Sequence, residues 1–82
     1  MFLKIKEEIN LEELEKYGFK QKYDVDTGEK QKLVAKLSDN LFVIIENKNR
    51  IINIHILNCK DDYMELINLI YKLTKADFIE EL

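Results

Sequence analysis

The chain has 82 residues, which is enough for one domain with one modest hydrophobic core. Hydrophobic residues make up 46% of it and charged residues 35%. This balance excludes a disordered segment, because enough apolar surface is present to offset the entropy lost on folding. The formal net charge of −3 weighs against a general nucleic-acid binder, since such proteins are usually basic.

The cysteine content and the apolar runs indicate a cytoplasmic protein. Cys59 is the only cysteine, whereas a secreted chain of this size usually needs several disulfides. The first residues, Met1 to Glu8, alternate apolar and charged, and they lack the apolar core of a signal peptide. The longest apolar run, Leu41 to Ile45, suits a buried strand and is far too short for a membrane span.

A short strand and a capped helix are predicted at the start of the chain. Alternation over Met1 to Lys6 is typical of a strand. Asn10 can cap a helix over Ile9 to Phe19, and Glu13 occupies the reciprocal position of a capping box. Gly18 can end this helix in the left-handed conformation.

Four strands in meander order are predicted next. Their apolar or alternating segments are Phe19 to Val25, Lys32 to Leu37, Leu41 to Ile45 and Arg50 to Leu57. Short polar turns separate them, at residues 26–28, 38–40 and 47–49. Within the last strand, Ile52, Ile54 and Ile56 should share one face, with Asn53 and His55 on the other.

The last long element is an amphipathic helix that Asp62 can cap. Its apolar arc is wide, and we expect the sheet to take the stripe of Tyr63, Leu66, Ile67 and Ile70. The polar strip is narrow, and the helical phase breaks after about Lys75. Residues 76–82 should therefore form a separate short element or a frayed tail.

Together these elements predict an α+β fold in one domain, 1–82. A mostly antiparallel sheet, made of the short N-terminal strand and the four-strand meander, would carry two helices on one face. The opposite face of the sheet would be at least partly wet. The position of the first strand in the sheet is left open by the sequence.

Three surfaces are candidates for contact with a partner. The first is an acidic end that could mimic phosphates and occupy a nucleic-acid groove on a partner, although charged helix faces are also ordinary. Its residues are Glu7, Glu8, Glu12, Glu13 and Glu15. The second is the exposed part of the apolar arc on the last helix, at Met64 and Tyr71 or at Leu69, unless the first helix and the tail cover it.

The third surface is the wet face of the sheet. Lysines on one hairpin could join polar residues of the last strand to bind nucleic acid or nucleotides, although lysines on an edge strand also prevent aggregation. Its residues are Lys20, Lys22, Lys32, Lys36, Asn53 and His55. Phe42 is the only aromatic candidate for base stacking there, and its facing is undecided by the sequence.

Catalytic and metal-binding chemistry finds little support in the sequence. The stretch Asp24 to Gly28 resembles the start of a calcium loop, but the sixth and twelfth loop positions hold Glu29 and Ala35 instead of glycine and glutamate. His55 and Cys59 lack an orienting third group for nucleophilic catalysis. We therefore expect no catalytic residue, no metal and no cofactor.

The two ends of the chain resemble a known group of proteins. Residues 5–19, IKEEINLEELEKYGF, are similar to the opening of many short proteins of prophages and other mobile elements in low-GC Gram-positive bacteria. Residues 69–82, LIYKLTKADFIEEL, resemble their common ending, while the middle of the chain departs from the pattern. The resemblance implies a phage-type accessory protein in the cytoplasm of a bacterial host.

These observations lead to three functional hypotheses for a non-enzymatic protein. The first is a phage-type inhibitor that binds and blocks a host protein complex, such as a CRISPR effector. The second is a small nucleic-acid or nucleotide binder that uses the lysine-rich sheet face. The third is a homodimeric structural or regulatory module assembled through the last helix.

Overall fold

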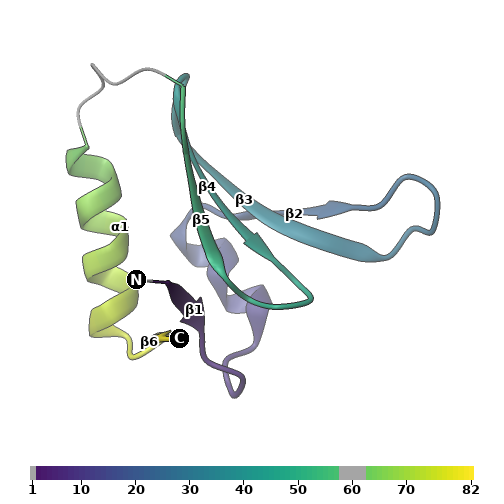
Figure 1. The fold of residues 1–82 in the computed structure, drawn as a ribbon, viewed down its shortest axis with the longest axis horizontal. Helices are drawn as coiled ribbons and strands as arrows, with labels where there is room; N and C mark the ends of the chain where they lie inside the picture. Colours follow the sequence, from purple (N-terminus) through teal and green to yellow (C-terminus); the bar gives the residue numbers. More distant parts are fainter. Residues whose placement is uncertain (1, 58–62) are drawn as a thin grey trace.

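The computed structural model describes residues 2–57 and 63–82 of the chain (Figure 1). In chain order the elements are β1 (Leu3–Ile5), η1 (Leu11–Tyr17), β2 (Lys20–Tyr23), β3 (Lys30–Ser38), β4 (Leu41–Glu46), β5 (Ile52–Ile56), α1 (Met64–Lys75) and β6 (Ile79–Glu81). The predicted α+β class is confirmed. The β2–β3 hairpin extends away from the helices, and the two ends of the chain lie close together beside the lower end of α1 (Figure 1).

The predicted four-strand meander forms an antiparallel sheet in the order β2-β3-β4-β5. Its three connections include the predicted turn residues; Gly28, for example, has φ 75° in the β2–β3 loop. The register shifts between Lys22 and Tyr23 and again between Lys36 and Ser38. Such irregularities bend a strand and increase its twist.

One face of this sheet carries the hydrophobic core. Alternate residues of β3 and β4 are fully buried, namely Leu33, Ala35, Leu41, Val43 and Ile45. Leu14 of η1 and Leu73 of α1 belong to the same buried cluster as Val43. The two helices therefore cover the same face, and the opposite face of the meander is the wet face, as predicted.

The first helix is confirmed in position but has 3₁₀ geometry. Asn10 caps it, and its side chain accepts a hydrogen bond from the backbone N–H of Glu12 at 3.0 Å. The reciprocal bond, in which the Asn10 backbone N–H would donate to the Glu13 carboxylate, is not formed. At the other end, Gly18 (φ 94°) donates to the Glu15 carbonyl and Phe19 donates to the Leu14 carbonyl, which is the Schellman arrangement.

The chain ends pair with each other in a second, two-stranded sheet. Strands β1 and β6 run antiparallel, with Ile5 opposite Ile79. A single bridge between Lys4 and Ile51 joins this pair to β5. Residues 76–82 therefore include a strand that supports the N-terminal one, and they are not a frayed tail.

The rotation of α1 differs from the predicted one. Leu69 (5% exposed) and Leu73 (0%) face the core, while Ile67, which we expected to pack on the sheet, is 57% exposed. The apolar arc is wider than the surface that the sheet offers, so the sequence alone did not fix which part is buried. Asp62, the predicted cap, lies outside the described residues.

Candidate binding surfaces

The register brings the six residues predicted for the lysine-rich face onto one side of the sheet. Residues directly opposite in antiparallel strands share a face, and facing alternates along each strand. Lys22 lies opposite Lys32, and Lys20 lies opposite Val34. The face also holds residues of β4 and β5. We call this set the outer face: Lys20, Lys22, Lys32, Val34, Lys36, Phe42, Ile44, Glu46, Asn53 and His55.

Phe42 lies on the outer face. Its facing was not determined by the sequence pattern. It is the cross-strand partner of both Lys36 on β3 and His55 on β5, so the three side chains form one row across the sheet. Phe42 is half-buried, whereas Lys36 and His55 are exposed. An aromatic side chain thus stands between a cation and an imidazole on a surface that neither η1 nor α1 covers.

Most of the lysines on the outer face are available to a partner. Lys36 forms an exposed ion pair with Asp39, the first residue after β3, at 3.3 Å. Within residues 2–57 and 63–82, Lys20, Lys22 and Lys32 make no ion pair. Three cations therefore remain unneutralised at the β2–β3 end of the face, with Glu46 opposite Lys32 as the nearest carboxylate in register.

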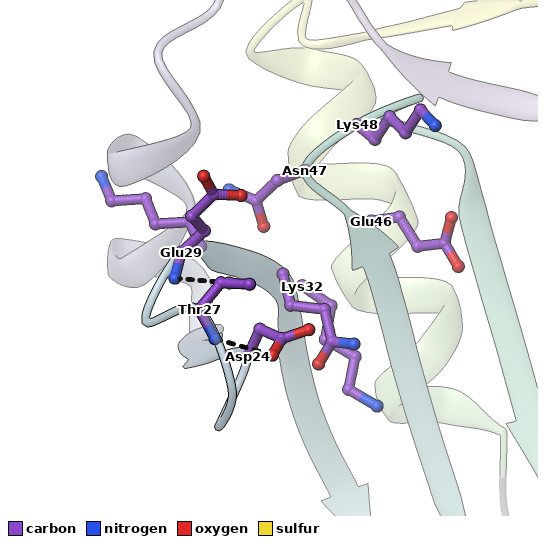
Figure 2. Close-up of a pocket in the computed structure, with 9 residues that line it drawn as sticks. Asp24, Thr27, Glu29, Lys32, Glu46, Asn47 and Lys48 are labelled. Atoms are coloured by element: carbon purple, nitrogen blue, oxygen red, sulfur yellow. Dashed lines mark hydrogen bonds between the residues drawn. The ribbon is translucent and has the colours of Figure 1, made fainter.

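A hollow of about 640 Å³ borders the outer face at the β2–β3 loop. Figure 2 shows Asp24, Thr27 and Glu29 on one side and residues 46–48 on the other, with Lys32 between them. The Asp24 carboxylate already accepts hydrogen bonds from the backbone N–H groups of residues 26 and 27, at 2.8 and 3.2 Å. Acidic and basic side chains line the hollow in similar numbers, so its charge selects no ligand class.

The predicted acidic end is partly neutralised. Lys4 Nζ lies 2.9 Å from Glu7 Oε1, and Arg50 Nε lies 3.5 Å from Glu7 Oε2. The hydrogen bond from Lys4 lowers the pKa of Glu7 and raises the pKa of Lys4. Glu12 is paired with Lys30 at 3.2 Å. Only Glu8, Glu13 and Glu15 of the five carboxylates carry no ion pair within the described part of the chain.

The predicted apolar contact residues on α1 are only partly available. Met64 (56% exposed) and Tyr71 (59%) are open to solvent, and the Lys75 ammonium lies 5.7 Å from the centre of the Tyr71 ring. Leu69 is buried, so its assignment as a contact residue is wrong. The reason is the rotation of α1, which turns Leu69 toward the core and Ile67 toward solvent.

Arg50 has a role that was not recognised in the sequence. It lies in the β4–β5 turn with φ 63°, and its Nη1 donates to the carbonyl oxygens of Lys6 and Ile9 at 2.6 and 2.7 Å. These bonds hold the segment between β1 and η1 against the meander. The available signal was that Arg50 is the only arginine, directly after a predicted turn.

The described residues hold no group of three or more His, Cys, Asp and Glu side chains that could bind a metal ion. Cys59 lies outside the described ranges. Among the same residues, no helix has the length and apolar character needed to cross a membrane. Comparison with protein-family models, with curated proteins and with solved structures gives no match to this chain.

Proposed function

We propose that the protein is a non-catalytic binding protein and that its outer face binds single-stranded nucleic acid. The observation that supports this proposal is that Lys20, Lys22, Lys32 and Phe42 share one uncovered face of the sheet. Unpaired lysines attract a phosphate backbone, and an aromatic ring can stack on a base without selecting its sequence. The net charge of −3 does not oppose this, because the acidic residues of η1 belong to the opposite side of the sheet.

The same lysines also suit a role in preventing aggregation at the β2 edge. That role requires charge on β2 alone. It does not require Lys32 on the inner strand β3, nor an aromatic residue on the same face. The combination therefore favours ligand binding.

The test is binding of fluorescently labelled single-stranded RNA and DNA as a function of salt concentration. Three free lysines can neutralise about three phosphates, so the logarithm of affinity should fall with the logarithm of salt with a slope of about −2. Changing Lys20, Lys22 and Lys32 together to glutamine should abolish this slope. The matched control changes Lys16, Lys72 and Lys75 to glutamine, which removes the same charge from the helices. Equal loss in both variants, or no binding at low salt, would refute the proposal.

A second candidate function is inhibition of a host protein by direct contact. The observation that favours it is the exposure of Met64 and Tyr71, which lie two turns apart on the same side of α1. The resemblance of the chain ends to mobile-element proteins suggests a defence complex, such as a CRISPR effector, as the host target. The acidic residues contribute less to this proposal than the sequence suggested, because Glu7 and Glu12 are already paired with cations.

This candidate is tested by affinity capture from a nuclease-treated bacterial lysate. A stoichiometric protein captured by the wild type should be lost when Met64 and Tyr71 are changed to glutamate. It should be retained when the outer-face lysines are changed to glutamine. Capture that survives the glutamate changes would remove the α1 contact from consideration.

A further inference from the structure

The outer face has three chemically different parts, which follow one another across the sheet. Its lysines all lie on β2 and β3. Its apolar side chains, Val34, Ile44 and Phe42, lie on the two inner strands and are half-buried. Its uncharged polar side chains, Asn53 and His55, lie on β5. Because the strand order is β2-β3-β4-β5, the face changes from cationic to apolar and then to uncharged polar.

Carboxylates do not interrupt this order at the end of the face that holds Phe42. Glu46, the one carboxylate of the outer face, lies opposite Lys32 and four residues along β4 from Phe42, which is about 13 Å in a strand. Asp39 follows β3 and pairs with Lys36 in solvent. An exposed pair of this kind is weak, so a phosphate can displace the Asp39 carboxylate.

The row of side chains through Phe42 has the same order as the parts of a nucleotide. Lys36 and His55 are both cross-strand partners of Phe42, on opposite sides of it. The lysine can hold a phosphate, and the ring can stack on the base that follows from this phosphate. The hydrogen-bonding edge of the base then lies over β5.

Asn53 has free hydrogen-bonding groups at this position. It lies opposite Ile44 and is therefore a diagonal neighbour of Phe42, at about 7–8 Å, which is within reach of an aromatic side chain. Its Nδ2 group donates one long hydrogen bond, 3.4 Å, to the Ile51 carbonyl. Its Oδ1 atom accepts no hydrogen bond within the described part of the chain. One acceptor and one N–H thus remain for a base.

We propose that Asn53 recognises an adenine base stacked on Phe42, so that the outer face selects single strands that contain adenine. A carboxamide presents an acceptor beside a donor, the pattern that pairs with N6 and N7 of adenine. Adenine is the one base that offers the complementary pattern on both its Watson–Crick and its Hoogsteen edge. This inference rests on the proposed binding of single strands and adds the base that is selected.

The lysines and Asn53 have separable roles in this arrangement. Lysines attract the phosphates of every sequence alike, so they determine the salt dependence of binding. Asn53 is uncharged and contacts the base, so it determines the preference among bases without changing the salt dependence.

The test compares two single strands that differ only in the N6 amino group. Oligonucleotides of about ten residues carry either adenine or purine, which is the same ring without this group. Stacking on Phe42 and the phosphate contacts are retained in both. In anisotropy measurements the wild type should bind the adenine strand at least about fivefold more tightly. Asn53→Ala should bind both strands equally and keep the salt slope of the wild type.

The matched control is Asn68→Ala, at an exposed asparagine of α1 outside the outer face, and it should keep the adenine preference. Asn53→Thr makes the same test with a side chain that favours strands, in case Asn53→Ala does not fold. Changing the three unpaired lysines of the outer face to glutamine should weaken binding of both strands by the same factor.

Equal binding of the two strands by the wild type would overturn the role given to Asn53, while salt-dependent binding of both would still support the proposed function. An adenine preference that persists in folded Asn53→Ala or Asn53→Thr would also overturn that role. Absence of binding to either strand at low salt would instead refute the proposed function, and the base selection with it.

Discussion

Lys22 and Lys32 lie directly opposite one another across strands β2 and β3, with both side chains on the outer face. Like charges in this position destabilise a sheet. Within the described ranges, neither ammonium group is paired with a carboxylate. No ion pair therefore offsets the repulsion between Lys22 and Lys32. A feature that lowers stability and concentrates positive charge is expected where a negatively charged ligand binds.

The facing pair of Lys22 and Lys32 predicts that removing one charge raises the stability of the protein and lowers its affinity for nucleic acid. Changing Lys22 to glutamate replaces repulsion of Lys32 by attraction, so the free energy of unfolding should rise by roughly 0.2–1 kcal/mol. Affinity for single-stranded nucleic acid should fall in the same variant. Urea denaturation and binding anisotropy measure the two quantities. A variant that is both less stable and equally active would contradict the role given to Lys22.

Arg50 should be important for stability although it lies in a turn. Its guanidinium satisfies the carbonyl oxygens of Lys6 and Ile9, so Arg50→Ala should lower the free energy of unfolding by about 1–3 kcal/mol. Arg50→Lys keeps the charge but not the planar donor fork, and it should recover only part of this loss. Chemical denaturation gives the comparison, and an alanine variant as stable as the wild type would exclude the anchoring role.

The rotation of α1 is tested by two alanine substitutions on the same helix. Leu69→Ala removes a side chain from the core and should cost about 2–5 kcal/mol. Ile67→Ala removes a side chain that is 57% exposed and should change stability by less than about 0.5 kcal/mol. The opposite ranking in thermal or urea unfolding would mean that the helix is turned as the sequence pattern suggested.

Gly18 provides a test of the helix end. It has φ 94°, and an added Cβ would meet no heavy atom within 4 Å, so the cost of Gly18→Ala is conformational. We expect a loss of about 1 kcal/mol for alanine. Gly18→Asn should lose less, because asparagine tolerates the left-handed region better. Equal stability of the alanine variant and the wild type would show that the Schellman arrangement is dispensable.

The Lys4–Glu7 pair predicts a pH dependence of stability. The pKa of Glu7 is lowered from its ordinary value of 4.5 in the folded protein, chiefly by the hydrogen bond from Lys4. Its contribution is therefore fully present above about pH 4.5 and is lost as the pH falls through the lower folded value. Glu7→Gln should be less stable than the wild type at neutral pH, and the difference should vanish in acid. The control is Glu13→Gln, at an exposed carboxylate that makes no ion pair with residues 2–57 or 63–82.

Local sequence signals predicted the local structure well. Asn10 and Gly18 delimit the first helix through bonds within a few residues, so its ends follow from the chain itself. The outer face also followed from local signals, because alternation and short turns determine which residues of a meander share a side. Phe42 was ambiguous, since its strand is apolar on both faces.

Relationships between distant residues were not accessible in this way. The alternation of residues 3–5 indicates a strand but does not identify residues 79–81 as its partner. The buried side of α1 depends on the space left by η1 and the meander, and the wide apolar arc is compatible with several rotations. Leu69 and Ile67 exchanged their expected positions for this reason.

The pairing of β1 with β6 has a consequence for the order of folding. Each hairpin of the meander joins neighbouring segments, so these strands can form soon after they are synthesised. Strand β1 is made first but must wait for residues 79–81, at the other end of the sequence, before its pairing is complete. Closing so long a loop carries a high entropic cost for two three-residue strands. We therefore expect the terminal pair to form last, to open first in amide hydrogen exchange, and to expose Ile5 and Phe78 when it opens.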